Sequence, residues 1–180
     1  MDGKWTPTKF KGKELKEKIL GIIGYGSIGR RVAEIAKKGF DMKIIYINSK
    51  SSRIEFENLL RESDFISINT PLTEQTKGMI SKKEFDLMKR GVCIINTGRG
   101  AVLDEKLLID NLKSGKVFAA GLDVFSKEPI EKESLFINNP NISLTPHIGF
   151  NTEEAEYSLS QIVVDNIKNF VDGHPINLIS

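Results

Sequence analysis

Short apolar runs alternate along this chain with segments whose apolar residues recur at helical spacing. The runs lack the polar alternation of a half-exposed strand, as expected for strands buried on both faces of a parallel sheet. We therefore predict the α/β class, with a doubly wound parallel sheet in a single domain. Six strands are predicted, at residues 20–23, 43–47, 65–68, 92–95, 118–122 and 142–144.

Segments with helical periodicity fill the intervals between the predicted strands. The first places Ile28, Val32, Ile35 and Ala36 on one face of a helix. A short helix is predicted from the apolar residues Phe56, Leu59 and Leu60. The next two are predicted from start signals: a capping box of Ser81 and Glu84 precedes Phe85 and Met88, and the cap Asp104 precedes Leu107, Leu108 and Leu112. The last helix is predicted to start near Thr152 and to pack through Ala155, Leu159, Ile162, Val163, Ile167 and Phe170.

Composition places the chain among ordinary globular proteins and narrows its partners. It has 180 residues, a net charge of +2, 39% apolar residues and 28% charged residues. The near-neutral balance argues against a nucleic-acid partner, and no apolar run reaches the roughly 20 residues of a membrane span. A single cysteine and the lack of a signal-peptide pattern favour a cytoplasmic location. We expect residues 1–18 to form a polar lead-in with a short helix and residues 19–180 to form the domain.

The sequence Gly24-Tyr25-Gly26-Ser27-Ile28-Gly29 follows a predicted strand and opens a predicted helix. In that context the pattern G-x-G-x-x-G indicates the phosphate-binding turn of a Rossmann fold. Gly24 permits the tight turn, Gly26 lets a pyrophosphate approach the backbone, and Gly29 lets the helix pack close to the strand. Ser27 and Ile28 lie at the turn, where free helix N–H groups favour an anion. The alternatives are a turn needed only for packing and an S-adenosylmethionine-binding loop.

The residue that contacts the ribose of a dinucleotide lies about 20 residues past such a motif. That residue is Asn48, at the end of the second predicted strand. An acid there would bind both ribose hydroxyls and repel a 2′-phosphate, and Asn48 removes that repulsion. The residues from Ser49 to Arg53 add hydrogen-bond donors and positive charge, so we expect NAD or NADP as the cofactor. A solvated polar turn that contacts no ligand is the alternative.

Four further blocks of sequence follow the glycine motif in order. They are Asn69-Thr70-Pro71-Leu72-Thr73, Asn96-Thr97-Gly98-Arg99-Gly100, Gly121-Leu122-Asp123-Val124-Phe125 with Glu128-Pro129, and Thr145-Pro146-His147-Ile148-Gly149. Together the blocks resemble the coenzyme-binding domain of the D-isomer-specific 2-hydroxyacid dehydrogenases, from about Trp5 to the end of the chain. That family includes D-lactate, glycerate, phosphoglycerate and formate dehydrogenases and glyoxylate/hydroxypyruvate reductases. The resemblance implies an enzyme that transfers a hydride between NAD(P)H and a small 2-oxo or D-2-hydroxy acid.

The resemblance implies that Arg99, Glu128 and His147 are catalytic, and the chemistry favours these residue types. The planar guanidinium of Arg99 can hold a carboxylate by two hydrogen bonds. The unperturbed pKa of a histidine lies near neutrality, so His147 can donate and take back a proton. Glu128 could accept a hydrogen bond from the other ring nitrogen and hold the orientation of the imidazole. Surface salt bridges and solvated turns are the structural alternatives for each residue taken alone.

The resemblance also implies which residues contact the cofactor. Thr70 and Pro71 would line the adenosine side, and Thr97 and Gly98 would lie near the nicotinamide ribose. Asp123 could accept a hydrogen bond from the carboxamide, or it could be purely structural. We expect no metal ion, and the expected cofactor-binding residues are Gly24, Gly26, Ser27, Ile28, Gly29, Asn48, Ser49, Thr70, Pro71, Thr97, Gly98, Arg99, Asp123, His147 and Gly149.

Members of the family are typically nearly twice as long as this chain, and most of their substrate domain precedes the coenzyme domain. We therefore expect that these 180 residues lack the substrate domain, bind dinucleotide and turn over slowly. The alternative function is a non-catalytic dinucleotide-binding regulatory or dimerisation module, because some relatives of the family act as transcriptional corepressors. The segment from Trp5 to Lys18 resembles part of the family's dimer contact, so we expect a homodimer.

Overall fold

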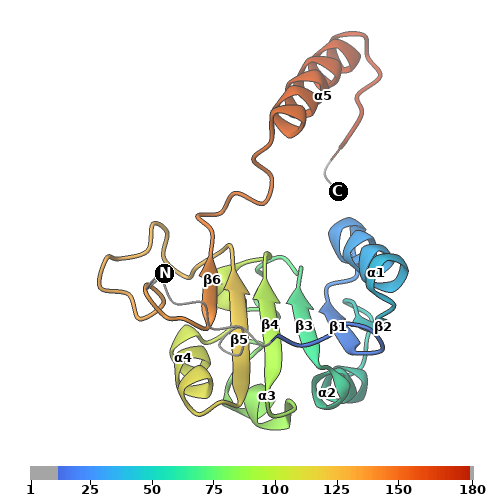
Figure 1. Ribbon diagram of the computed structural model, residues 1–180. Helices are drawn as coiled ribbons and strands as arrows, with labels where there is room; N and C mark the ends of the chain where they lie inside the picture. Colours follow the sequence, from blue (N-terminus) through green and yellow to red (C-terminus); the bar gives the residue numbers. More distant parts are fainter. Residues whose placement is uncertain (1–11, 179–180) are drawn as a thin grey trace. The chain divides into compact units, whose positions relative to one another are not determined.

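The computed structural model of the chain describes residues 12–178. Strands and helices alternate along it (Figure 1), and all six predicted strands are confirmed within one residue of their expected bounds. The elements are β1 (Ile19–Ile23), α1 (Ser27–Phe40), β2 (Lys43–Ile47), α2 (Arg53–Glu62), β3 (Phe65–Ile68), α3 (Lys82–Leu87), β4 (Val92–Asn96), a 3₁₀ turn (Gly100–Val102), α4 (Glu105–Lys113), β5 (Val117–Leu122), β6 (Ile142–Leu144) and α5 (Glu153–Val171).

The chain divides into two compact units, Met1–Pro146 and His147–Ser180. The first unit holds the sheet with α1 to α4, and the second holds α5 and the residues that follow it. Residues 12–18 form a turn before β1 and contain no helix. The rest of the expected lead-in, including Trp5, lies outside the described residues, so the proposed domain boundary at residue 18 stays a prediction.

All six strands form one parallel sheet, in the order β2-β1-β3-β4-β5-β6 (Figure 1). The doubly wound α/β class predicted from the apolar pattern is therefore confirmed. After β1 the chain steps outward to β2, then returns past β1 to β3 and continues in the opposite direction. The connection after β1 and the connection after β3 therefore lead in opposite directions along the sheet. The place between β1 and β3 is the switch point of the topology, and ligands of such sheets bind there, outside the carboxyl ends of the strands.

Alternate residues of β1 contribute to two separate apolar clusters. The smaller cluster joins Leu20 and Ile22 of β1 to Ala33 and Ala36 of α1. The larger cluster includes Ile23 and takes side chains from α2, α3 and α4, among them Leu60, Phe85 and Leu108. Because crossovers between parallel strands are right-handed, the reversal of direction at β1 puts α1 on the opposite face from the other three helices.

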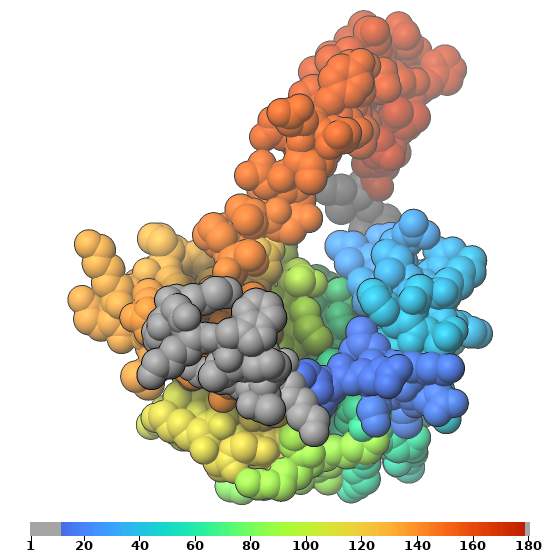
Figure 2. Space-filling model, viewed as in Figure 1, coloured from blue at the N-terminus to red at the C-terminus, as the bar shows by residue number. Residues whose placement is uncertain are grey.

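The predicted buried face of α1 is confirmed for Ala36, which is buried, and for Val32, which packs against the smaller cluster. It is wrong for the other two residues of that face. Ile28 and Ile35 are 63% and 48% exposed, whereas Gly29, Ala33 and Ala36 are buried. Small residues line the contact because the backbone of α1 lies close to β1, and large side chains there would hold the helix away. The opposite side of α1 forms part of the molecular surface, shown in light blue in Figure 2.

The start signals predicted for the later helices are confirmed. Glu84 Oε2 accepts hydrogen bonds from Ser81 N at 3.0 Å and Ser81 Oγ at 2.6 Å, which closes the predicted capping box. Asp104 Oδ1 accepts from Leu107 N at 2.9 Å and starts α4. These contacts satisfy backbone N–H groups that a helix leaves without an internal partner at its first turn.

In the second unit, α5 begins as predicted, with Thr152 Oγ1 accepting from Ala155 N at 3.1 Å. Within the second unit none of the described side chains of α5 is buried, and packing through its apolar stripe stays a prediction. Capping and backbone hydrogen bonds are local, whereas burial of a stripe requires an apolar surface from elsewhere. Within residues 12–178, no helix is both long enough and apolar enough to cross a membrane.

Two glycines of α1 provide a matched test of the close contact between this helix and β1. A Cβ atom at Gly29 would lie 2.2 Å from Gly24 O, whereas one at Gly39 would meet nothing within 4 Å. We expect Gly29→Ala to lower the stability by about 1–3 kcal/mol through overpacking, and Gly39→Ala to raise it by about 0.5 kcal/mol. Thermal unfolding measures both, at roughly 2–4 °C per kcal/mol for a chain of this size. Equal changes of the melting temperature would contradict the close packing.

Candidate functional site

The glycine loop lies in direct backbone contact with the loop that follows β3. Gly24 has φ +93°, and a Cβ there would lie 2.8 Å from Asn69 C and from Thr70 N. A Cβ at Gly29 would approach Gly24 O, as described above. A Cβ at Gly26, in contrast, would have no atom within 4 Å. Packing therefore explains Gly24 and Gly29, whereas the space at Gly26 is open to a ligand that approaches the backbone.

The N-terminus of α1 is the only one of the five described α-helices that lacks both a capping side chain and an acid in its first turn. Gly26 occupies its N-cap, and Ser27 and Ile28 follow it as exposed residues. The other four helices begin after serine, aspartate or threonine and carry glutamate in the first turn. Because α1 runs over 14 residues, its N-terminal N–H groups and positive dipole end form a favourable site for an anion.

The turn after β2 lies beside the glycine loop. Gly24 N donates to Ile47 O at 3.1 Å, and Ile47 is the last residue of β2. Asn48 Oδ1 accepts from Lys50 N at 2.8 Å, and Ser51 Oγ accepts from Asn48 N at 3.2 Å. Asn48, Ser49 and Lys50 are all exposed at this turn. The amide of Asn48 therefore supports the turn that reaches the expected ribose position.

The loop after β3 connects the glycine loop to the end of β4. Asn69 N donates to Ile23 O at 2.8 Å, and Thr97 Oγ1 donates to Asn69 Oδ1 at 3.3 Å. Thr70 is half-buried and Pro71 is exposed. A Cβ at Gly98 would lie 2.8 Å from Thr70 O, so this loop and the next also meet backbone to backbone.

Asn96 builds the turn that carries Arg99, and we did not predict this role from the sequence. Its side chain is fully buried at the carboxyl end of β4. Its Nδ2 donates to Arg99 O at 3.0 Å, and its Oδ1 accepts from Gly98 N at 3.0 Å. Arg99 itself is exposed, and its Nη1 donates to Gly98 O at 2.7 Å. A polar residue at the end of an apolar strand was the available signal for Asn96.

Asp123 follows β5 and is buried, with 7% of its surface exposed. Its Oδ1 accepts from Thr145 Oγ1 at 2.6 Å, and its backbone N donates to Asn96 O at 3.0 Å. Asp123 thus links the ends of β4 and β5 to the residues after β6. This contact shows a structural role, and the expected hydrogen bond to a carboxamide stays a prediction.

Glu128 lies in the loop after β5, before a cis peptide bond to Pro129. Its Oε1 accepts from Phe125 N at 2.9 Å, which holds the carboxylate on this loop. A Cβ at Gly100 would lie 2.0 Å from Phe125 C, so the loops after β4 and β5 are in direct contact. The two loops that carry Arg99 and Glu128 therefore lie at the same edge of the sheet and support each other.

His147 begins the second unit, and Gly149 lies in the same unit. His147 is half-buried, has φ +55°, and meets the ring of Phe150 edge-on with centroids 6.4 Å apart. The first unit ends at Pro146, so His147 belongs to a different unit from Arg99 and Glu128. The catalytic set of three residues therefore stays a prediction.

Comparison with known proteins decides the family. The model of the NAD-binding domain of D-isomer specific 2-hydroxyacid dehydrogenases matches residues 1–149. The chain belongs to this family. The glyoxylate reductase of Thermococcus litoralis is 46% identical over 187 residues, which cover 98% of this chain and 56% of that protein. Membership in an NAD-binding family removes the S-adenosylmethionine alternative for the glycine loop.

Solved structures agree with membership of the D-isomer specific 2-hydroxyacid dehydrogenases. A glyoxylate reductase from Paecilomyes thermophila aligns with a TM-score of 0.84 at 40% identity, over 92% of this chain and 53% of that one. An acyclic imino acid reductase in complex with NADPH and D-Arg aligns with a TM-score of 0.87 at 32% identity, over 98% and 58%. The chain thus spans about half the length of the relatives it matches, and both NAD and NADP fit the family as cofactors.

The open space at Gly26 can be tested without disturbing the fold. We expect Gly26→Ala to fold normally, because the added methyl group meets no atom of residues 12–178 within 4 Å. Its affinity for NADH and NADPH should fall about tenfold or more, because the methyl group occupies the path of the pyrophosphate to the backbone. Nicotinamide fluorescence titration measures the affinity, and Gly39→Ala serves as the control. Unchanged affinity in Gly26→Ala would show that the loop does not hold the pyrophosphate.

Proposed function

We propose that this chain is the coenzyme-binding part of an oxidoreductase that transfers a hydride between NAD(P)H and a small 2-oxo or D-2-hydroxy acid. The observation that carries the proposal is the N-terminus of α1, which has no capping side chain and no acid and opens onto the free space at Gly26. The names of the relatives support the substrate class. These relatives include glyoxylate and hydroxypyruvate reductases.

The residues at the carboxyl edge of the sheet fit a nicotinamide dinucleotide. Its pyrophosphate would lie at Gly26, Ser27 and Ile28, and its adenosine ribose would lie near Asn48 and Ser49. The backbone of Thr97 and Gly98 would face the nicotinamide side. The reduced nicotinamide, when bound, supplies the hydride for the carbonyl carbon of the substrate.

Arg99 would bind the carboxylate of the substrate. Its guanidinium is exposed on a turn that the buried amide of Asn96 holds in shape. Two parallel hydrogen bonds from a guanidinium fix both the position and the orientation of a carboxylate. Such positioning keeps the carbonyl carbon at a constant place, which lowers the entropic part of the barrier.

His147 would donate a proton to the carbonyl oxygen as the ketone becomes an alcohol, and would take it back in the reverse reaction. Glu128 would accept a hydrogen bond from the other ring nitrogen. That contact would orient the imidazole and stabilise its charged form. These roles of His147 and Glu128, the homodimer and the cytoplasmic location all stay predictions.

A non-catalytic dinucleotide-binding module is the second candidate function. The observation that favours it is the open N-terminus of α1 at Gly26, which accounts for dinucleotide binding without the three catalytic residues. The two functions differ in one measurable property, because a binding module takes up NADH or NADPH without oxidising it when glyoxylate or hydroxypyruvate is added.

The role of His147 is tested against the second histidine of the chain. We expect His147→Gln to abolish the oxidation of NAD(P)H by glyoxylate or hydroxypyruvate while leaving the affinity for the dinucleotide within about twofold, because proton donation is lost and the phosphate contacts remain. His174→Gln, in the residues after α5, is the matched control and should retain full activity. Loss of dinucleotide binding in His147→Gln would instead indicate a structural histidine.

Arg99→Lys tests the binding of the substrate carboxylate. The lysine keeps the positive charge but loses the planar pair of donors, so the KM for glyoxylate should rise about tenfold or more. Arg90→Lys is the matched control, since Arg90 lies in a turn before β4 and its Nη2 donates to Ser114 O at 2.6 Å. Steady-state kinetics at saturating dinucleotide gives the KM, and an unchanged value in Arg99→Lys would remove Arg99 from the substrate site.

A further inference from the structure

Residues 124–128, which we call the Glu128 loop, follow β5 at the carboxyl edge of the sheet. Glu128 Oε1 accepts a hydrogen bond from Phe125 N at 2.9 Å, so this bond joins the carboxylate to the backbone of its own loop. Whatever holds the backbone at Phe125 and Ser126 therefore also places the Glu128 carboxylate in the domain.

Two contacts from the segment after β4 hold that backbone. A Cβ at Gly100 would lie 2.0 Å from Phe125 C and 2.3 Å from Ser126 N, so the peptide between these residues lies directly against Gly100. Glu105, half-buried in the first turn of α4, reaches the same peptide, and its Oε1 accepts from Ser126 N at 2.6 Å. Hydrogen bonds to an ionised carboxylate are shorter and stronger than neutral ones. The backbone contact and the charged acceptor together fix the start of the Glu128 loop.

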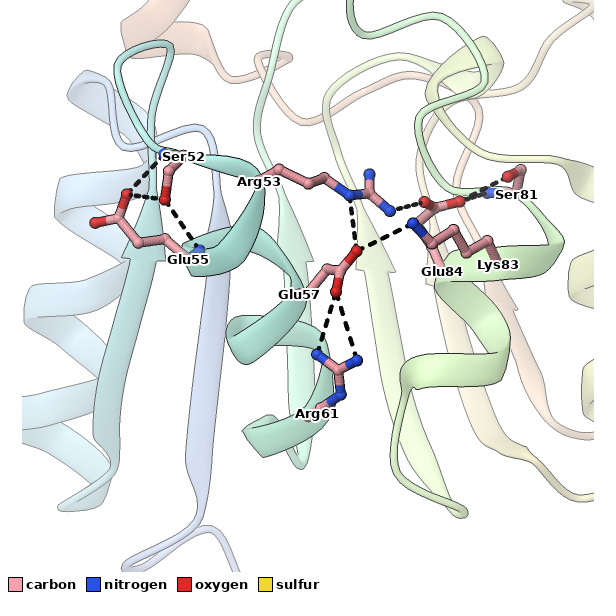
Figure 3. Close-up of polar contacts among 8 residues, drawn as sticks. All are labelled: Ser52, Arg53, Glu55, Glu57, Arg61, Ser81, Lys83 and Glu84. Atoms are coloured by element: carbon pink, nitrogen blue, oxygen red, sulfur yellow. Dashed lines mark hydrogen bonds and ion pairs between the residues drawn. The ribbon is translucent and has the colours of Figure 1, made fainter.

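The first-turn acids of α2 and α3 are used in a different way. Glu55 and Glu84 are the third residues of their helices, and each closes a capping box with its N-cap serine (Figure 3). Glu84 Oε1 also lies 2.6 Å from Arg53 Nη2, and Arg53 Nε lies 3.0 Å from Glu57 Oε1 (Figure 3). Burial raises the pKa of Glu84, but hydrogen bonds from the N-cap serine and from Arg53 outweigh it and hold the pKa below its usual value. Glu55 and Glu84 thus serve the starts of their own helices, and Arg53 joins α2 to α3.

Glu105 does not serve the start of its own helix in this way. It is the first residue of α4, and the N-cap before it, Asp104, already accepts from Leu107 N at 2.9 Å. A negative charge in the first turn of a helix is favourable wherever its carboxylate points. That general benefit does not require the bond to Ser126, which lies 21 positions away in the sequence. The consequence of this bond is therefore to be sought at the Glu128 loop.

We propose that Glu105 is a positioning residue for Glu128. By holding Ser126 N beside Gly100, it keeps the Glu128 loop and its carboxylate in one place at the edge of the sheet. The proposal rests on the proposed function, because it takes Glu128 as the carboxylate that orients the imidazole of His147. Displacement of such an orienting group slows proton transfer and leaves the binding of substrate and dinucleotide largely intact.

Amide hydrogen exchange, followed by NMR on the full chain, tests the placement without turnover. We expect Glu105→Ala to accelerate exchange about tenfold at both Ser126 N and Phe125 N, because release of the first amide frees the loop and with it the bond to Glu128. Glu105→Gln keeps an acceptor oxygen and should restore most of the protection at both amides. If only Ser126 N responded and Phe125 N kept its wild-type protection, the loop would hold its place without Glu105 and the proposal would be wrong.

Asp104→Asn is the matched control for the loss of charge. It removes one negative charge from the same end of α4, and asparagine still caps a helix well. Both amides and the activity should stay as in the wild type. Equal effects in Asp104→Asn and Glu105→Ala would assign the result to the charge at the start of α4 and would overturn the role of the bond to Ser126. Glu105→Ser, whose side chain is too short to reach Ser126 N, provides a second variant if Glu105→Ala does not fold.

Steady-state kinetics tests the consequence for the reaction. With glyoxylate and whichever of NADH and NADPH the wild type binds more tightly, Glu105→Ala should lower kcat about tenfold, because the orienting carboxylate is no longer held in place. The KM for glyoxylate and the Kd of the dinucleotide should stay within about threefold, because Arg99 and the glycine loop keep their own contacts. Glu105→Gln should recover most of kcat. A rise of KM or Kd with unchanged kcat would contradict a role through Glu128.

A double variant shows whether Glu105 acts through Glu128. Adding Glu105→Ala to Glu128→Gln should lower kcat by less than about twofold beyond Glu128→Gln alone, because two residues that act as one unit do not have additive effects. Losses that multiply would show that Glu105 acts by another route and would overturn the proposal.

The outcomes also separate this proposal from the proposed function. If the folded wild-type chain oxidises neither dinucleotide, the proposed function fails, and the amide exchange of Phe125 still decides whether Glu105 places Glu128. If the wild-type chain is active and Glu105→Ala keeps full kcat, the proposed function stands and the role of Glu105 is overturned.

Discussion

The close approach of backbone to backbone at the glycine loop is the constraint on which the rest of this edge of the sheet depends. The chain turns from β1 into α1 with the carbonyl of Gly24 in the space that a Cβ at Gly29 would fill. The same turn touches the backbone of Asn69 and Thr70. Any side chain at these positions would separate α1 from β1 or the glycine loop from the next loop. Glycine here allows a close-packed interface that leaves one open position, Gly26.

Gly26 is also the N-cap of α1, and it leaves this helix without a capping side chain, which packing does not require. Helices usually satisfy the N–H groups of their first turn with a side-chain oxygen, and four of the five described α-helices begin with such a residue and carry an acid. In α1 the cap is glycine, and no side chain caps the N–H groups of its first turn. The first turn of α1 thus lacks the stabilising hydrogen bond of a cap, and a bound anion could supply that bond. This is a physical reason to regard the glycine loop as an anion-binding site.

Buried polar side chains connect the separate loops of this edge. Asn96 holds the turn of Arg99 and accepts through its backbone carbonyl from Asp123 N. Asp123 in turn accepts from Thr145, just before the chain leaves the first unit. These bonds run across the ends of β4, β5 and β6, so a change at one loop reaches the next. The ion pairs of Arg53 play a comparable part between α2 and α3.

Local patterns in the sequence determined the six strands, the caps at Ser81, Asp104 and Thr152, and the glycine turn, because each depends on neighbouring residues. Tertiary structure decided which side chains are buried: Ile28 and Ile35 satisfy the helical period and yet are exposed, since small residues fill the contact of α1 with the sheet. It also decided that Arg53 pairs with Glu84, a partner 31 positions away in the sequence that no local pattern identifies. The apolar stripe of α5 shows the same distinction. Its helix forms from its own residues, whereas its burial depends on a surface that its own sequence does not specify.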